Sequence, residues 1–197
     1  MPDFSIENEY ISKGYRIICG ADEAGRGPLA GRVYAGACIL LPDTVIEGLN
    51  DSKKLSEKKR DLVYEEIKEK AVSYATAFCS SEEIDEINIL NAAMLAMKRA
   101  IEKLSPQPDF ILIDGNCTRG FEKNAAAIVK GDSKSNSIAA ASILAKVERD
   151  RYCLSLDEIY TQYGFKKHKG YPTKEHYEAI AKFGPCPEHR RSFKLYK

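Results

Sequence analysis

The chain has 197 residues, of which 44% are hydrophobic, 9% aromatic and 30% charged, and its formal net charge is +1. This length suits one domain with its own core, and this composition excludes disordered and fibrous proteins. No apolar run approaches the roughly 20 residues that cross a bilayer, and the N-terminus lacks the basic-then-apolar pattern of an export signal. We therefore expect no membrane association and a cytoplasmic location.

Apolar periodicity predicts alternating strands and helices along the chain. In chain order, the sequence predicts strands at 15–20 and 33–41, a helix at 56–70, a strand at 72–79, a helical region at 80–104, strands at 109–114 and 126–130, and helices at about 137–160 and 174–183. Within the helix at 137–160, alanines at 139–141 and 145 should allow close packing on a sheet. This order predicts a single α/β domain on a mixed β-sheet flanked by helices, with a helical C-terminal extension.

The small net charge conceals two oppositely charged parts. Residues 166–197 contain 9 basic and 3 acidic residues, a net of +6, which leaves a net of −5 for residues 1–165. We expect a core of about 16–165 to hold carboxylate or metal chemistry, and a basic helical segment at about 166–197 to bind a polyanion. A solvated helix and tail would explain the charge equally well. The six cysteines include no C-x-x-C pair, which fits a reduced compartment.

Four carboxylates follow predicted strands: Asp22 and Glu23 after the first, Asp114 at the end of a later one, and Asp132 after the next. Strand-end carboxylates suit Mg²⁺ or Mn²⁺, because hard cations prefer oxygen ligands. Two such ions can activate a water and stabilise the leaving oxygen of a phosphodiester, so phosphodiester hydrolysis is predicted. Asp22 and Glu23 can face one site only if the strand ends or bends there. The alternative is structural: turn acids, with Asp132 capping the following helix.

The segment between the first two strands is rich in glycine, with Gly25, Gly27 and Gly31 around Arg26. Glycine lets a ligand approach main-chain amides, and the arginine offers a guanidinium that matches a phosphate. The segment is not a P-loop, because it lacks the Lys-Ser/Thr ending and does not lead into a helix. A plain glycine turn is the alternative.

These residues, together with further ordered blocks over about 16–193, resemble the ribonuclease HII family. The matching blocks are GADEAGRGPLAG at 20–31, DSKKL at 51–55, IDG at 113–115, KGDSK at 130–134, IAAASI at 138–143, AKV at 145–147, HKGYPT at 168–173 and EHRRSF at 188–193. The resemblance implies an RNase H-like fold. It implies an endonuclease, dependent on Mn²⁺ or Mg²⁺, that hydrolyses the RNA strand of RNA–DNA hybrids. It also implies incision of duplex DNA on the 5′ side of single embedded ribonucleotides, leaving 3′-OH and 5′-phosphate ends.

The resemblance also assigns roles to residues that match the family's motifs. It implies metal-binding and catalytic roles for Asp22, Glu23, Asp114 and Asp132. It implies that Gly25, Arg26 and Gly27 contact the 2′-hydroxyl at the cleavage junction, the group that distinguishes RNA from DNA. Tyr171 would stack on the sugar of the following deoxynucleotide.

Several residues keep open roles. Lys53 and Lys54 are predicted either to contact phosphate or to be solvated, and His168 and His189 to contact phosphate or pack in the tail. Arg32 stands where the family more often has proline, and we expect little functional effect.

Partners follow from the same motifs. We expect RNA–DNA hybrids and ribonucleotide-containing duplex DNA as substrates, and a monomeric protein. Residues 193–197 lack a glutamine-led aromatic box, so no sliding-clamp partner is expected. The competing hypothesis, motivated by the basic end alone, is a non-catalytic hybrid-binding protein.

Overall fold

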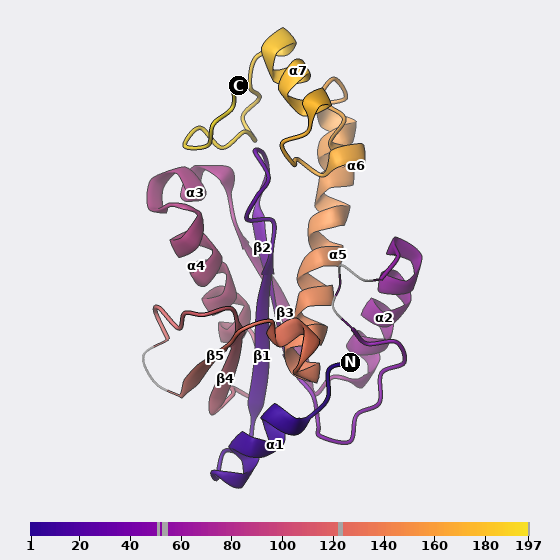
Figure 1. The fold of residues 1–197 in the computed structure, drawn as a ribbon, viewed down its shortest axis with the longest axis vertical. Coiled ribbons are helices and arrows are strands. Elements are labelled where there is room, and N and C mark those ends of the chain that lie inside the picture. Colours follow the sequence, from indigo (N-terminus) through magenta and orange to yellow (C-terminus); the bar gives the residue numbers. More distant parts are fainter. Residues whose placement is uncertain (51, 53–54, 122–123, 197) are drawn as a thin grey trace.

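The computed structural model describes residues 1–50, 52, 55–121 and 124–196, arranged as a sheet with helices on both faces (Figure 1). Its elements are α1 (Ser5–Ser12), β1 (Ile18–Ala24), β2 (Val33–Ile39), α2 (Glu57–Lys70), β3 (Ser73–Cys79), α3 (Ser81–Ile87), α4 (Ile89–Glu102), β4 (Phe110–Asp114), β5 (Ala125–Ile128), the 3₁₀ turn η2 (Gly131–Ser133), α5 (Asn136–Ile159), α6 (Phe165–His168) and α7 (Lys174–Phe183). No helix in the described ranges is long and apolar enough to cross a membrane.

The sheet is mixed, as the sequence predicts. Its strand order is β3-β2-β1-β4-β5, with β2 antiparallel to both β1 and β3, whereas β1, β4 and β5 are parallel to one another. Parallel neighbours end at the same edge, so the C-terminal ends of β1 and β4 lie together. The carboxylate at the end of β4 is thereby placed beside β1.

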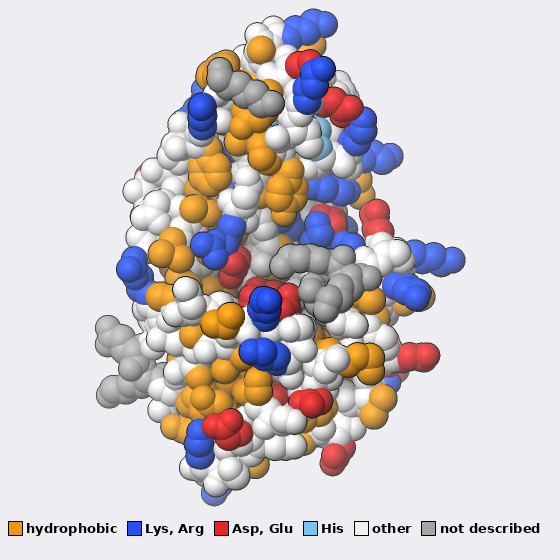
Figure 2. Space-filling model, in the orientation of Figure 1, with side chains coloured by type: hydrophobic (Ala, Val, Ile, Leu, Met, Phe, Trp, Pro, Cys, Tyr) orange, Lys and Arg blue, Asp and Glu red, His pale blue; other side chains and the backbone are white. Residues whose placement is uncertain are grey.

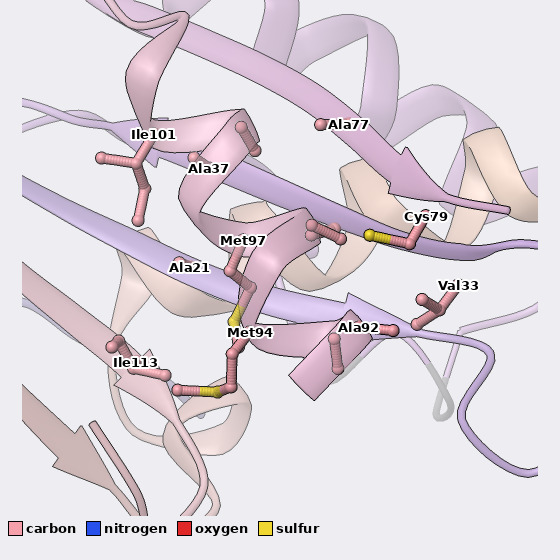
Figure 3. Packing of buried hydrophobic residues seen from close by; sticks show 14 of the residues in the cluster. Ala21, Val33, Ala37, Ala77, Cys79, Ala92, Met94, Met97, Ile101 and Ile113 are labelled. Carbon is pink, nitrogen blue, oxygen red and sulfur yellow. The ribbon is translucent and has the colours of Figure 1, made fainter. Parts of the chain in front are cut away.

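One face of the sheet packs against α4. The apolar side of this helix inserts Met94 and Met97 over Ala21 of β1 and Ile113 of β4 (Figure 3). Residues 21 and 113 are opposite each other in the β1–β4 register. Because side chains alternate along a strand, residues 22 and 114 project from the other face.

That other face lies directly against α5, whose backbone almost touches the strands. A Cβ on Gly20 would lie 2.2 Å from the carbonyl carbon of Ser137, and a Cβ on Gly36 would lie 2.2 Å from the carbonyl oxygen of Ala141. Alanines 139–141 and 145 are fully buried there. The predicted close packing of this helix on the sheet is confirmed. Side chains of α5 can therefore reach Asp22, which projects from this face.

Several elements differ from the sequence predictions; among them, β2 ends at Ile39 and β5 at Ile128, each two residues earlier than predicted. Strand β1 continues to Ala24, because its pairing with β2 extends as far as Ala24↔Tyr34; the prediction that Asp22 and Glu23 follow the strand is therefore wrong. The helical region at 80–104 is two helices, divided at Asn88 with φ of 66°. The cap of α5 is Ser135, so the alternative role of Asp132 as that cap is also wrong.

The C-terminal segment packs on the turn that joins β1 to β2. Leu29 and Ala30 of that turn share an apolar cluster with Phe165, Ile180 and Leu195. In Figure 2, lysine and arginine side chains line the edge of the upper part of the molecule, where Figure 1 places α6 and α7. This segment is thus joined to the glycine-rich turn and presents basic side chains to solvent.

Candidate active site

Asp22 and Asp114 occupy equivalent positions on adjacent parallel strands. Each follows the last register pair, Ala21↔Ile113, by one residue. Glu23 comes next on β1, and its charge and that of Asp22 both interact electrostatically with Asp114. Three of the four predicted carboxylates are therefore close enough to influence one another's ionisation.

A pocket of about 210 Å³ brings two of these acids together with the glycine-rich turn. Asp22, Glu23, Ala24, Gly25, Arg26, Gly27, Ser52, Ser142, Lys146, Arg149 and Tyr171 line it. The strand neither ends nor breaks between Asp22 and Glu23, yet both contribute to the same pocket. Acidic and basic side chains also lie next to one another at the middle of the face in Figure 2.

The pocket holds its carboxylates under electrostatic strain. Burial raises the pKa of Asp22 well above its ordinary value, and the neighbouring charges of Glu23 and Asp114 raise it further. A hydrogen bond with Ser142 and the Glu23 N–H, 2.7 Å from Asp22 Oδ1, act in the opposite direction. Burial also raises the pKa of Glu23, although Arg26, 3.3 Å away, opposes this. A cation placed between these acids would relieve the strain.

Asp114 and Asp132 are linked through the turn after β5. The N–H of Gly131 donates to Asp114 Oδ1 at 2.6 Å, and Asp132, the next residue, is buried in η2. Within the described ranges, no three His, Cys, Asp or Glu side chains converge tightly enough to enclose a metal ion by themselves. This donor set fits a hydrated Mg²⁺ or Mn²⁺ ion, since such ions use few protein carboxylates and keep water or phosphate oxygens as ligands.

Two buried arginines, Arg149 and Arg190, pack against the glycine-rich turn. Gly25 has φ of 101°, and a Cβ there would lie 2.0 Å from Nε of Arg149. Arg190 is fully buried and donates to four main-chain carbonyls of this turn: Gly25 at 2.7 Å, Arg26 at 3.0 Å, Pro28 at 2.8 Å and Gly31 at 2.9 Å. With its carbonyls held this way, the turn has a fixed shape.

Tyr171 stands at the rim of the same pocket. A Cβ on Gly27 would lie 3.5 Å from the tyrosine ring, and Arg149 lies 5.8 Å from the ring centroid. Tyr171 is 43% exposed, so part of it remains available to a ligand. The structure therefore gathers Gly25, Arg26, Gly27 and Tyr171 around Asp22 and Glu23, whereas Lys53 and Lys54 lie outside the described residues.

Sequence reasoning missed several residues that the fold brings to the pocket. Ser142 bonds Ser52 at 2.9 Å between hydroxyl oxygens. Lys146 is held by Asp150 at 2.6 Å, and Asp150 is in turn held by Arg60 at 3.1 Å. A usable signal was present: Ser142, Lys146 and Arg149 recur at intervals of four and three residues, which places them on one side of a helix. For Arg190 the sequence offers no such signal.

The chain is similar to known proteins over most of its length. The sequence model of the family described as Ribonuclease HII matches residues 19–196. A "Ribonuclease HII" of Clostridioides difficile is 58% identical over 188 residues, covering 95% of this chain and 74% of that protein. One of Caldicellulosiruptor bescii is 54% identical over 190 residues, covering 96% and 92%.

A solved structure, the PCNA:RNase HII complex from Archaeoglobus fulgidus, superposes with a TM-score of 0.76 at 26% identity, covering 92% of this chain and 97% of that one. The fold, the order of motifs and the sequence identity to curated relatives thus point to the same enzymes. The chain belongs to the ribonuclease HII family of nucleases.

Proposed function

We propose that this chain is a metal-dependent endonuclease that hydrolyses the RNA strand of RNA–DNA hybrids and incises duplex DNA on the 5′ side of single embedded ribonucleotides. The products would carry 3′-OH and 5′-phosphate ends. The observation that carries the proposal is one pocket in which buried carboxylates meet a clamped glycine-rich turn and a half-exposed tyrosine. A protein that only binds nucleic acid gains nothing from acids facing phosphates, which repel them.

The four carboxylates Asp22, Glu23, Asp114 and Asp132 would hold Mg²⁺ or Mn²⁺. The pKa of the buried Asp22 is raised by burial and by the nearby charges of Glu23 and Asp114, which supports a cation at this place. When bound, such ions supply an activated water and neutralise the charge that develops on the leaving oxygen. The chain's own contribution is to orient the carboxylates through the Ser142 hydroxyl and the amides of Glu23 and Gly131.

Basic side chains of α5 that line the same pocket would hold the phosphate that is cut. Arg149 is 1% exposed, and its Nε and Nη1 have no hydrogen-bond partner in the described part of the chain. Nη2 of the same guanidinium donates to the Lys169 carbonyl at 2.9 Å, which leaves Nε and Nη1 as the donors for phosphate oxygens. Lys146 lines the same pocket. These two cations would fix the phosphodiester against the carboxylates.

The glycine-rich turn and Tyr171 would recognise the sugars. Gly27 is exposed and carries no Cβ, so a 2′-hydroxyl can reach its main chain, while Gly25 lies buried against Arg149 and shapes the turn. Tyr171, next to Gly27, would stack on the following deoxyribose, which makes the step from RNA to DNA the recognised feature. This division of roles supports incision at isolated ribonucleotides.

The test is cleavage of a labelled DNA duplex that contains one ribonucleotide, with Mg²⁺ or Mn²⁺, beside an RNA–DNA hybrid and an all-DNA duplex as control. We expect a cut on the 5′ side of the ribonucleotide, cleavage of the hybrid, and no cleavage of the control. Asp114→Asn should remove cleavage while duplex binding persists. Binding without cleavage by the unmodified protein across both metals would overturn the proposal in favour of a hybrid-binding protein.

A further inference from the structure

The three histidines of the chain form one buried stack beside Tyr171. His168, His176 and His189 are at most 7% exposed. The ring centroids of His168 and His176 are 4.4 Å apart, and those of His176 and His189 are 5.2 Å apart. Their burial favours packing over phosphate contact, and it raises the question of why this core uses polar rings.

The hydrogen bonds of the stack determine where each proton is. Nδ1 of His176 lies 2.9 Å from the Tyr171 carbonyl, which can only accept, so this nitrogen donates. Nδ1 of His189 accepts from the Cys186 N–H at 2.9 Å, so a neutral His189 has its proton on Nε2. That proton is donated across 3.1 Å to Nε2 of His176. The chain of bonds therefore has one consistent arrangement with both rings neutral.

The third ring obeys the same logic. Nδ1 of His168 accepts from the Gly170 N–H at 3.2 Å, and its Nε2 donates to the Tyr163 carbonyl at 2.8 Å. Burial lowers the pKa of His176 and of His189 to about 4, which agrees with neutral rings at pH 7. Every ring nitrogen in the stack thus has a partner.

The stack connects Tyr171 to the glycine-rich turn. At one end, His176 holds the Tyr171 carbonyl; Gly170, just before it, accepts from the Leu29 N–H at 2.8 Å. At the other end, His189 pairs with Ala30 in an isolated β-bridge, directly before the arginine that clamps the turn. Two surfaces that border the pocket are therefore tied by one chain of directional bonds.

We propose that His176 is a positioning residue, which fixes the main chain of Tyr171, through the hydrogen bond to its carbonyl, so that the tyrosine ring stays against Gly27. The inference rests on the proposed function, since it assigns the ring the task of recognising the RNA-to-DNA step. A ring that only fills space would be replaceable by any residue of similar volume. A positioning ring requires a donor at the place of Nδ1.

Two substitutions separate these possibilities, because asparagine places its amide nitrogen near the position of Nδ1 and glutamine places it near that of Nε2. His176→Asn should keep the donor to Tyr171, whereas His176→Gln should lose it. We expect His176→Gln to lower the kcat/KM ratio of the single-ribonucleotide duplex to the continuous RNA–DNA hybrid about tenfold, with His176→Asn near the unmodified value. Equal ratios in both variants would overturn the proposal.

A double substitution tests whether the effect passes through the tyrosine. In a Tyr171→Ala background, His176→Gln should change this ratio no further; an additional loss of similar size would contradict the proposal. Nitrogen NMR of the unmodified protein at pH 7 should show His176 protonated on Nδ1, and His168 and His189 on Nε2. Any other pattern would overturn the bond chain, even where a variant fails to fold.

An activity-independent readout keeps this inference distinct from the proposed function. The Hα resonances of Gly27 report the ring current of Tyr171, and they should move in His176→Gln but not in His176→Asn. If the unmodified protein fails to incise the single-ribonucleotide duplex, the proposed function fails, while the Gly27 resonances still decide the positioning role. Unmoved Gly27 resonances in a folded His176→Gln variant would refute that role.

Discussion

Two neighbouring regions of this molecule bury polar groups in opposite ways. Around Asp22, buried acids face like charges, and burial raises the pKa of both Asp22 and Glu23. In the histidine stack, every ring nitrogen has a partner, and burial lowers the pKa of His176 and His189 so that both rings stay neutral. A buried charge without a counter-charge costs free energy, whereas a satisfied neutral network does not. The strained region is where we place the chemistry, and the satisfied region holds its walls in position.

The largest expected effect comes from removing strain at the carboxylates. Asp22→Asn should lower the cleavage rate by on the order of 10³-fold, since metal-assisted charge stabilisation is lost. The same change should raise the unfolding free energy of the metal-free protein by about 1–2 kcal/mol, because a buried like charge disappears. Rate assays and denaturant unfolding in chelator measure the two effects. A metal-free variant with a lower unfolding free energy than the unmodified protein would show that the buried charge of Asp22 does not destabilise the fold.

The next largest effect concerns Arg190, which directly follows His189 of the histidine stack. Arg190→Met should lower the unfolding free energy by about 3–5 kcal/mol, because four buried carbonyls lose their donor. Burial, with the nearby charge of Arg149, lowers the pKa of Arg190 to about 9. The adjacent Arg191 is exposed, so Arg191→Met is the matched control, with a change of about 0.5 kcal/mol or less. Similar losses in both variants, measured by denaturant unfolding, would remove the clamping role.

Lowering the pH should change the contributions of the two regions to folding stability in opposite directions. The pKa of His176 and His189 falls from about 6.5 to about 4 on folding, so their unfolded forms bind more protons and stability is lost as pH drops between these values. We expect about 3 kcal/mol for each ring. The raised pKa of Asp22 acts the other way, because the folded form binds the extra proton and gains stability on acidification.

The unfolding free energy of Asp22→Asn and of the unmodified protein, compared at several pH values, measures these opposite effects. In chelator, Asp22→Asn should lose stability more steeply than the unmodified protein between pH 6.5 and 4, since the compensating proton uptake is gone. Denaturant unfolding at several pH values gives both curves. Parallel curves would mean that Asp22 does not take up a proton in this range.

The same contrast explains how much of the site the sequence revealed. Asp114 was predictable, because an apolar run that ends in an acid places the carboxylate at a sheet edge whatever the topology. Asp22 and Glu23 were predicted as site residues, but the strand before them was predicted to end at residue 20. It continues to Ala24 because it pairs with β2, and such pairing depends on contacts across the sheet. Arg190 was not predictable as a clamp, since its hydrogen-bond acceptors lie about 160 residues earlier in the chain.

Ser142 and Lys146 show a second limit. Both belong to a run that was predicted, correctly, as a buried helix, and burial alone assigns no role to its polar residues. Their spacing shows that they share one side of α5, but that this side faces Asp22 follows from the register of α5 against β1, which the close approach at Gly20 fixes and no local pattern encodes. Strands, helices and acids were therefore accessible to sequence reasoning, while the supporting residues required the fold.

The smallest expected effect concerns Arg32, which belongs neither to the pocket nor to the histidine stack. Arg32 lies over the rings of Phe78 and Tyr152, at 4.0 Å and 4.6 Å from their centroids, outside the pocket lining. Arg32→Gln should lower the unfolding free energy by about 1 kcal/mol, the loss of two partly exposed cation–π contacts, and leave kcat/KM unchanged. In a Phe78→Leu background the loss should shrink, because one ring is already absent. A decrease in kcat/KM for Arg32→Gln would instead place this arginine among the residues that contact the substrate.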